Sequence, residues 1–178
     1  MLVITKQTPL KVVLEVGKEC DKCNNCCKHD SGIVLEEDIS RIAKSMNLSE
    51  KKFKETYLVE HERFNTACYK FKQEKLVDEK TKNKKPYGKC IMLHDELGCM
   101  IHNVKPLHCK VCSVKSKYGE ALTQWFALNY LVNINNPESI RQWATFLQFQ
   151  TPIQGGELKD LIPDKQKLSK ILNYEILK

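Results

Sequence analysis

The chain has 178 residues, of which 42% are hydrophobic and 29% charged, and its formal net charge is +7. These values are typical of a globular protein and exclude collagen-like and low-complexity chains. A chain of this length buries roughly 70% of its unfolded surface, so it does not need a metal merely to compensate for small size.

The sequence predicts no targeting or membrane-spanning segment. Residues 1–17 include Lys6, Lys11 and Glu15, so they lack the apolar core of a signal peptide. Residues 125–132 are the most apolar stretch and are far too short to cross a bilayer. We therefore expect a soluble, cytoplasmic protein without a membrane partner. In that reducing compartment, nine cysteines indicate metal or redox chemistry rather than disulfides.

The first third is expected to contain a strand followed by two helices. Apolar residues alternate from Leu10 to Val16, as they do in a strand. The acids of residues 36–38 suit the positive end of a helix, and Ser49 suits the N-cap of the next one. Apolar residues recur at helical spacing in both: Ile39, Ile42, Ala43, Met46, Phe53 and Tyr57.

The segment 70–89 is rich in lysine. Tyr69 and Phe71 alternate with lysines, which indicates an exposed strand, and residues 80–89 are expected to form a basic loop. Acidic residues dilute the charge, which favours a solvated loop. The alternative is that this segment contacts an acidic protein or a nucleic-acid surface.

A β-hairpin is expected next. Two short apolar runs, residues 90–94 and 99–102, are joined by four residues that end in Gly98, as is typical of a hairpin. Cys90 and Cys99 should then lie near one another at its open end.

The last third is expected to be helical. Asn136 and Pro137 suit an N-cap and a first helical turn, and Pro163 is expected to open a final helix. Helical aromatic residues usually belong to a core rather than to a ligand pocket. We therefore predict core positions for Trp125, Phe126, Trp143, Phe146 and Phe149.

These elements predict a mainly helical α+β protein. A small cysteine-rich, metal-organised region with a β-hairpin should precede a C-terminal helical bundle. We expect a single domain over residues 1–178, with a metal-binding region at residues 18–112 and a helical part at residues 113–178 packed on it.

The cysteines carry the clearest chemical signal. Cys20, Cys23 and Cys26 are separated by two residues each, and Cys27 follows directly. A third cysteine at this spacing is typical of an iron–sulfur cluster, [4Fe–4S] above all, completed by a distant cysteine. Zinc is the alternative, because Cys109 and Cys112 supply a second C-x2-C pair. Adjacent side chains diverge, so Cys27 is expected to bind a second metal or to take part in redox chemistry.

The motif and the later cysteines together resemble a known family. Gly98-Cys99-Met-Ile-His102 is followed by Lys105-Pro106 and then by Cys109. With Cys20-x2-Cys23-x2-Cys26-Cys27 and Cys90, these residues resemble the CxxCxxCC zinc- or iron-chelating family of the YkgJ type. Lys105 and Lys110 stand where the family usually has arginine, so the positive charge is kept but bidentate geometry is not. Cys68 and Cys112 are additions to the family pattern.

The predicted metal ligands are the family cysteines together with Cys112: Cys20, Cys23, Cys26, Cys27, Cys90, Cys99, Cys109 and Cys112. The resemblance extends to the cysteine region of flagellin lysine-N-methylases, for which it implies an iron–sulfur centre. His29, His102 and His108 are expected to support ligands or to be exposed rather than to bind metal.

Three functions remain open at this point. The favoured one is a cytoplasmic protein that holds an iron–sulfur cluster in a redox or scaffold role. A zinc-stabilised module that docks on a protein or nucleoprotein complex is the second. The third is a protein-modifying, methyltransferase-like enzyme, although no Gly-rich loop lies between a strand and a helix to bind adenosylmethionine.

Overall fold

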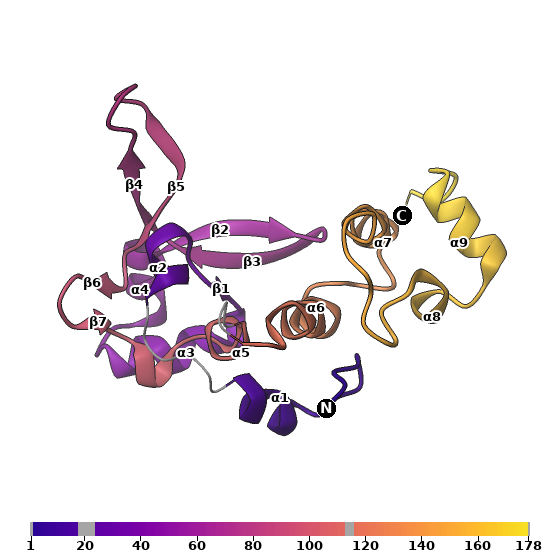
Figure 1. Cartoon of the computed structure of the whole chain (residues 1–178), viewed down its shortest axis with the longest axis horizontal. Coiled ribbons are helices and arrows are strands. Elements are labelled where there is room, and N and C mark those ends of the chain that lie inside the picture. The colour runs from indigo at the N-terminus through magenta and orange to yellow at the C-terminus, as the bar shows by residue number, and fades with distance from the viewer. Residues whose placement is uncertain (1, 18–23, 113–115, 178) are drawn as a thin grey trace.

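The computed structural model describes residues 2–17, 24–112 and 116–177. In this part the chain is a mixed α+β protein, in which helices alternate with small antiparallel sheets (Figure 1). No helix among these residues is long and apolar enough to cross a bilayer.

The segment expected to be a strand is instead the helix α1 (Leu10–Val16). The prediction was wrong because Val13 and Leu14 lie on a helical face that meets the core, where Val13 is fully buried and Leu14 packs beside it. Gly17 follows α1 next to the helix α5 (Leu107–Val111). A Cβ atom at Gly17 would lie 2.8 Å from the carbonyl oxygen of Lys110, so the close approach requires glycine.

The two helices predicted after the cysteine motif are confirmed. The side chain of Ser49 accepts a hydrogen bond from the backbone N–H of Lys52, at 3.2 Å, and so caps the second helix as expected. The short helix that precedes them carries Cys26 and Cys27 of the cysteine motif, and a short strand connects it to this pair. The four elements in order are α2 (Asn25–His29), β1 (Ile33–Val34), α3 (Glu36–Ser45) and α4 (Glu50–Tyr57).

A three-stranded antiparallel sheet follows, in the order β1-β3-β2. Its long hairpin consists of β2 (Leu58–Arg63) and β3 (Thr66–Phe71). The strand expected at Tyr69 and Phe71 is therefore confirmed, but Phe71 is only 2% exposed. The expectation of an exposed strand was wrong at Phe71, because its ring packs edge-on against Phe53 of α4.

The second hairpin projects from the body of the molecule (Figure 1). It pairs β4 (Gln73–Val77) with β5 (Lys84–Cys90), so residues 84–89 of the expected basic loop belong to a strand. We call residues 73–90 the lysine arm. Its base contacts α2 through the rings of His29 and Tyr87, whose centroids are 5.9 Å apart.

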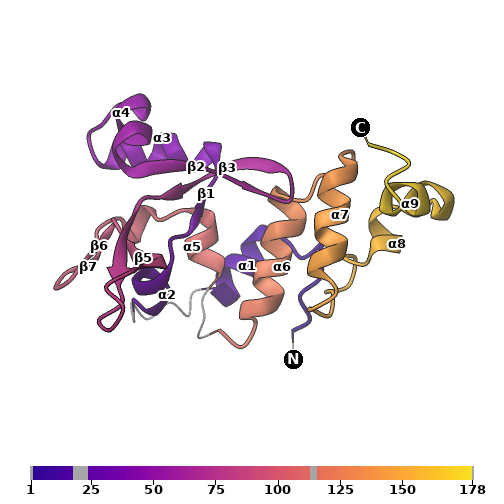
Figure 2. The same cartoon turned by 90° about the horizontal axis from the view of Figure 1, so that it is seen from above.

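Short elements then lead from the lysine arm to α5. The strands β6 (Leu93–His94) and β7 (Gly98–Cys99) pair antiparallel, with Leu93 opposite Cys99. The 3-10 helix η2 (His102–Val104) connects them to α5. Figure 2 shows β6 and β7 at one end of the molecule, α2 and α5 further inward on the same side, and α8 and α9 at the other end.

Helices make up the remainder. As predicted, the side chain of Asn136 caps a helix whose first residue is Pro137. The final helix begins two residues after Pro163, because Asp164 caps it through the backbone N–H groups of Gln166 and Lys167. The four helices are α6 (Gly119–Tyr130), α7 (Pro137–Phe146), α8 (Leu158–Leu161) and α9 (Lys165–Leu172).

The larger hydrophobic core joins residues from both ends of the chain. Ile33 and Phe64 belong to the same buried cluster as Trp125 and Trp143. The aromatic core positions are therefore confirmed at Trp125, Phe126 and Trp143, each at most 3% exposed, and Phe146 packs at the edge of the cluster. The prediction was wrong for Phe149, which is 80% exposed.

Candidate metal centre

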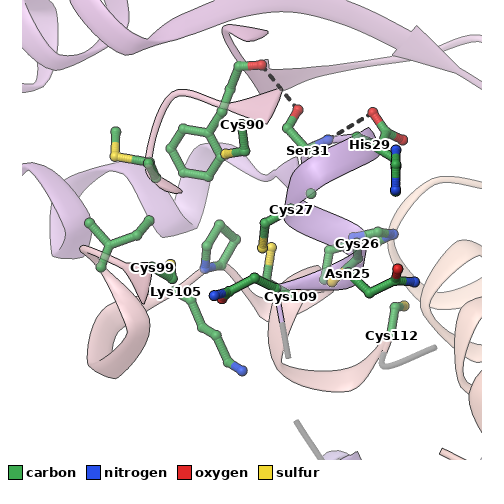
Figure 3. A pocket seen from close by; sticks show the side chains of 18 of the residues that line it. Asn25, Cys26, Cys27, His29, Ser31, Cys90, Cys99, Lys105, Cys109 and Cys112 are labelled. Carbon is green, nitrogen blue, oxygen red and sulfur yellow. Dashed lines mark hydrogen bonds between the residues drawn. The ribbon is translucent and has the colours of Figure 1, made fainter. Parts of the chain in front are cut away.

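The cysteines of α2 and α5 and those next to the β6–β7 hairpin surround one cavity of about 440 Å³. Residues far apart in sequence therefore meet at a single site (Figure 3). Two of the predicted ligands, Cys20 and Cys23, lie outside the described residues. The other six all line the cavity: Cys26, Cys27, Cys90, Cys99, Cys109 and Cys112.

The helix α2 places the adjacent cysteines at different depths. Asn24, at its N-terminus, has the left-handed backbone conformation (φ 59°) that asparagine tolerates better than most residues. After this turn, Cys26 is exposed and Cys27 is half-buried against the smaller core cluster. The two thiols nevertheless lie within hydrogen-bonding distance of one another.

The helix α5 presents two further thiols. Cys109 lies within α5, and Cys112 is the residue that follows its last turn. The opposite face is anchored in the larger core by Leu107 and Val111, which are 9% and 0% exposed. Burial of that face leaves Cys109 on the cavity side of α5. Cys112 lines the cavity from beyond the end of the helix, and it also packs against the larger core.

Figure 3 shows the thiols arranged around the cavity rather than at one point. Cys27 and Cys109 point toward one another from α2 and α5, and Cys109 also interacts electrostatically with Cys90 and Cys99. Cys112 lies on the other side of α2 from Cys90 in this view, and it interacts with Cys26.

Burial keeps the deeper thiols protonated. It raises the pKa of Cys90 and of Cys112 to about 11, and it raises the pKa of Cys109 well above the usual range. The hydrogen bond between Cys26 and Cys27 acts differently, because it lowers the pKa of Cys26 to about 6 and raises that of Cys27. A metal ion entering this cavity must therefore displace protons from the buried thiols, whereas Cys26 already offers a thiolate.

Gly32 permits the approach of Cys109, a role that the sequence did not reveal. A Cβ atom at Gly32 would lie 2.1 Å from the Cys109 sulfur and 3.4 Å from His108 Nδ1. The distance to the sulfur is too short for a methyl group to be accommodated without movement of the thiol. The signal was absent from the sequence because 77 residues separate the two positions and only the fold brings them together.

We predict that Gly32→Ala reduces metal binding by at least about tenfold, because the added methyl group displaces the Cys109 sulfur. Metal content and competition with a chelator measure the effect. The same substitution in a Cys109→Ala background should cost much less stability, because the clashing sulfur is gone. Full metal retention in Gly32→Ala would contradict the placement of Cys109.

The remaining predicted residues have distinct positions. His29, His102 and His108 all line the cavity. The ring of His108 packs edge-on against Phe126, and burial lowers its pKa to about 4, so it is neutral at physiological pH. Cys68 is buried in the core on β3, and it is absent from the described lining of the cavity.

The donor set suits a thiophilic metal, and the spacing of the donors limits how it is held. Among the described residues, no three His, Cys, Asp or Glu side chains converge on a point that could hold one metal ion. A zinc ion requires four ligand atoms within about 2.3 Å of a single centre. An iron–sulfur cluster instead takes its cysteines at separate iron atoms, around a larger volume. Thiols of the kind that line this cavity bind both zinc and iron–sulfur clusters.

Comparison with known families gives one match. Residues 19–127 match the family CxxCxxCC, which is described as a "Putative zinc- or iron-chelating domain". No curated protein matches the chain, and no solved structure does so. The matched range covers more than half of the chain and includes every cysteine of the cavity. The chain therefore belongs to the CxxCxxCC family of metal-chelating cysteine-cluster domains.

Proposed function

We propose that this protein holds an iron–sulfur cluster, most simply a [4Fe–4S] cluster, in a redox or scaffold role in the cytoplasm. The observation that carries the proposal is the ring of six thiols around a cavity of about 440 Å³, without convergence of three donors at one point among the described residues. The proposed ligands are drawn from these six together with Cys20 and Cys23. When bound, a cluster of this kind supplies one-electron transfer or structural cross-linking.

The described residues supply what such a cluster requires. The helices α2 and α5 both contribute thiols to the cavity, and Lys105 lies at the cavity as a positive group near Cys26 and Cys109. A cluster with four thiolates is anionic, so a nearby ammonium group favours its retention. We also propose that residues 18–112 form the metal-binding region and residues 113–178 pack on it, which the shared core supports.

Anaerobic purification followed by iron, sulfide and zinc analysis tests this proposal. We expect iron and acid-labile sulfide in equal amounts and a broad visible absorption that disappears on oxidation. A colourless protein with stoichiometric zinc and neither iron nor sulfide would overturn the cluster and leave zinc as the metal. A protein that binds neither an iron–sulfur cluster nor zinc would overturn the assignment of the cavity as a metal centre.

A second candidate function is supported by the lysine arm. Its described side chains include four exposed lysines, Lys75, Lys80, Lys82 and Lys84, on a hairpin that projects from the body (Figure 1). This charge favours docking of the protein on a polyanion, for which single-stranded or duplex nucleic acid is the simplest probe.

Fluorescence anisotropy at several salt concentrations tests the second function. Replacing Lys80, Lys82 and Lys84 by glutamine should reduce the salt dependence of binding by about one unit of slope per lysine that contacts a phosphate. The matched control removes three exposed lysines of α9 instead, Lys165, Lys167 and Lys170. Equal losses for the two variants, or no binding at low salt, would rule out the lysine arm as a specific contact.

A further inference from the structure

One wall of the cavity is a short segment between two of its cysteines. Residues 104–107 connect η2, which follows Cys99, to α5, which carries Cys109. Lys105 and Pro106 line the cavity. The position of Cys109 therefore depends on how this segment is held.

A buried carboxylate on α3 binds the backbone of this segment without lining the cavity. Asp38 is 4% exposed, and its oxygens accept the backbone N–H of Leu107 at 3.2 and 3.3 Å. The same carboxylate accepts the backbone N–H of Leu35 at 3.3 Å. Leu107 is the first residue of α5, and Leu35 is the N-cap of α3. One negative charge therefore satisfies the N-termini of both helices, where backbone N–H groups lack intrahelical partners.

Arg41, one turn later on α3, binds the carbonyl groups of the same segment. Its guanidinium donates to Asp38 at 2.5 Å, to the carbonyl oxygen of Val104 at 2.5 Å and to that of Lys105 at 3.4 Å. Asp38 thus accepts from the segment while Arg41 donates to it. The fork of an arginine suits this combination, which a lysine could not reproduce with one nitrogen.

We propose that Asp38 and Arg41 are positioning residues of the metal centre, which set the orientation of Cys109 by fixing residues 104–107. We call them the α3 clamp. This inference rests on the proposed function only in that Cys109 is a metal ligand. Neither side chain is among the residues lining the cavity, so the α3 clamp acts through the backbone that leads to the thiol. Groups that orient a metal ligand typically change metal affinity by about 10–100-fold when they are removed.

The test compares the α3 clamp with a similar network elsewhere. Arg141 of α7 is 7% exposed, and it donates to Glu138 at 2.7 Å and to the carbonyl groups of Ile171 and Ile176 at 2.9 and 3.0 Å. It lies among the C-terminal helices, so Arg141→Gln destabilises the fold without touching residues 104–107. We therefore compare three variants: Asp38→Asn, Arg41→Gln and Arg141→Gln. Each variant is measured at a temperature that lies equally far below that variant's own midpoint of thermal unfolding.

Two measurements decide the result. Transfer of metal from the loaded protein to a chelator should be about 10–100-fold faster in the two clamp variants and unchanged in Arg141→Gln. In metal-free protein, alkylation of Cys109 by iodoacetamide, followed by mass spectrometry, should accelerate in the clamp variants alone. If Asp38→Asn does not fold, Arg41→Gln alone tests the proposal. The Arg41 side chain is 39% exposed, so its replacement should destabilise the protein less.

The possible outcomes separate the two proposals. Equal acceleration in all three variants would show a general loss of stability and overturn the α3 clamp. Unchanged release and alkylation in both clamp variants would overturn it as well. A wild-type protein that binds no metal would remove the proposed function, whereas faster alkylation of Cys109 in the clamp variants alone would still support the positioning of this thiol.

Discussion

Replacing Cys109 by serine should weaken metal binding by more than about 100-fold, which is beyond the effect of removing a residue that only supports a ligand. The thiol lies on the cavity side of α5 and interacts with Cys90 and Cys99. Its loss therefore removes a ligand that lies among the other thiols of the cavity. A serine hydroxyl is a poor ligand for a thiophilic metal. Metal analysis after purification measures the loss, and thermal unfolding measures the accompanying loss of stabilisation by bound metal.

Cys68→Ala is the matched control for this substitution. Cys68 is 5% exposed and lies in the core on β3, so it differs from Cys109 in position and not in chemistry. We expect this variant to keep its full metal content and to lose only about 1 kcal/mol of stability through the missing packing. If Cys109→Ser kept its metal, or if Cys68→Ala lost it, the assignment of the cavity as the metal centre would be wrong.

Truncating Trp143 to alanine should cost about 3–5 kcal/mol of folding free energy, which is a large share of the total stability of a domain. Trp143 is fully buried, stacks on Phe146 and meets the ring of Phe64 edge-on. Its indole N–H also donates to the carbonyl oxygen of Gly156 at 2.8 Å, and alanine leaves that acceptor without this donor. Chemical denaturation of the metal-free protein measures the change.

The control for Trp143 is another aromatic residue near the end of the same helix. Phe149 is 80% exposed, so Phe149→Ala should change the stability by less than about 0.5 kcal/mol. Because Trp143 is not among the residues that line the cavity, we expect the Trp143→Ala protein that remains folded to bind metal at the normal stoichiometry. A small loss of stability in Trp143→Ala would show that the core can collapse around the missing ring.

Local signals in the sequence were sufficient for several elements. The helix α3 follows from the spacing of Ile39, Ile42 and Ala43, because a period near 3.6 leaves only one secondary structure that buries all three. Ser49 and Asn136 specify helix starts by their own side chains, which bond to backbone groups only two or three residues away. Such interactions are contained in a few consecutive residues, so they can be read without knowledge of the fold.

The predictions were wrong where packing against other parts of the fold determines the secondary structure or the burial of a residue. Leu10–Val16 is short enough for its apolar residues to fit a strand or a helix, and burial of Val13 in the core selects the helix α1. Phe149 is an aromatic residue of a type that is common in cores. It lies just beyond α7, where the residue is 80% exposed. Propensity is a weak guide in both cases, because packing energy exceeds the local preference.

The sequence by itself determined the family and the kind of chemistry, because the spacing of the cysteines is a local property and thiolates select soft metals. Only the tertiary structure brought Cys26, Cys27, Cys90, Cys99, Cys109 and Cys112 around one cavity. It also decided that Gly32 must make room for Cys109 and that Asp38 must hold the N-terminus of α5. These contacts join residues more than 60 positions apart, and their geometry depends on how helices and strands pack rather than on any local pattern.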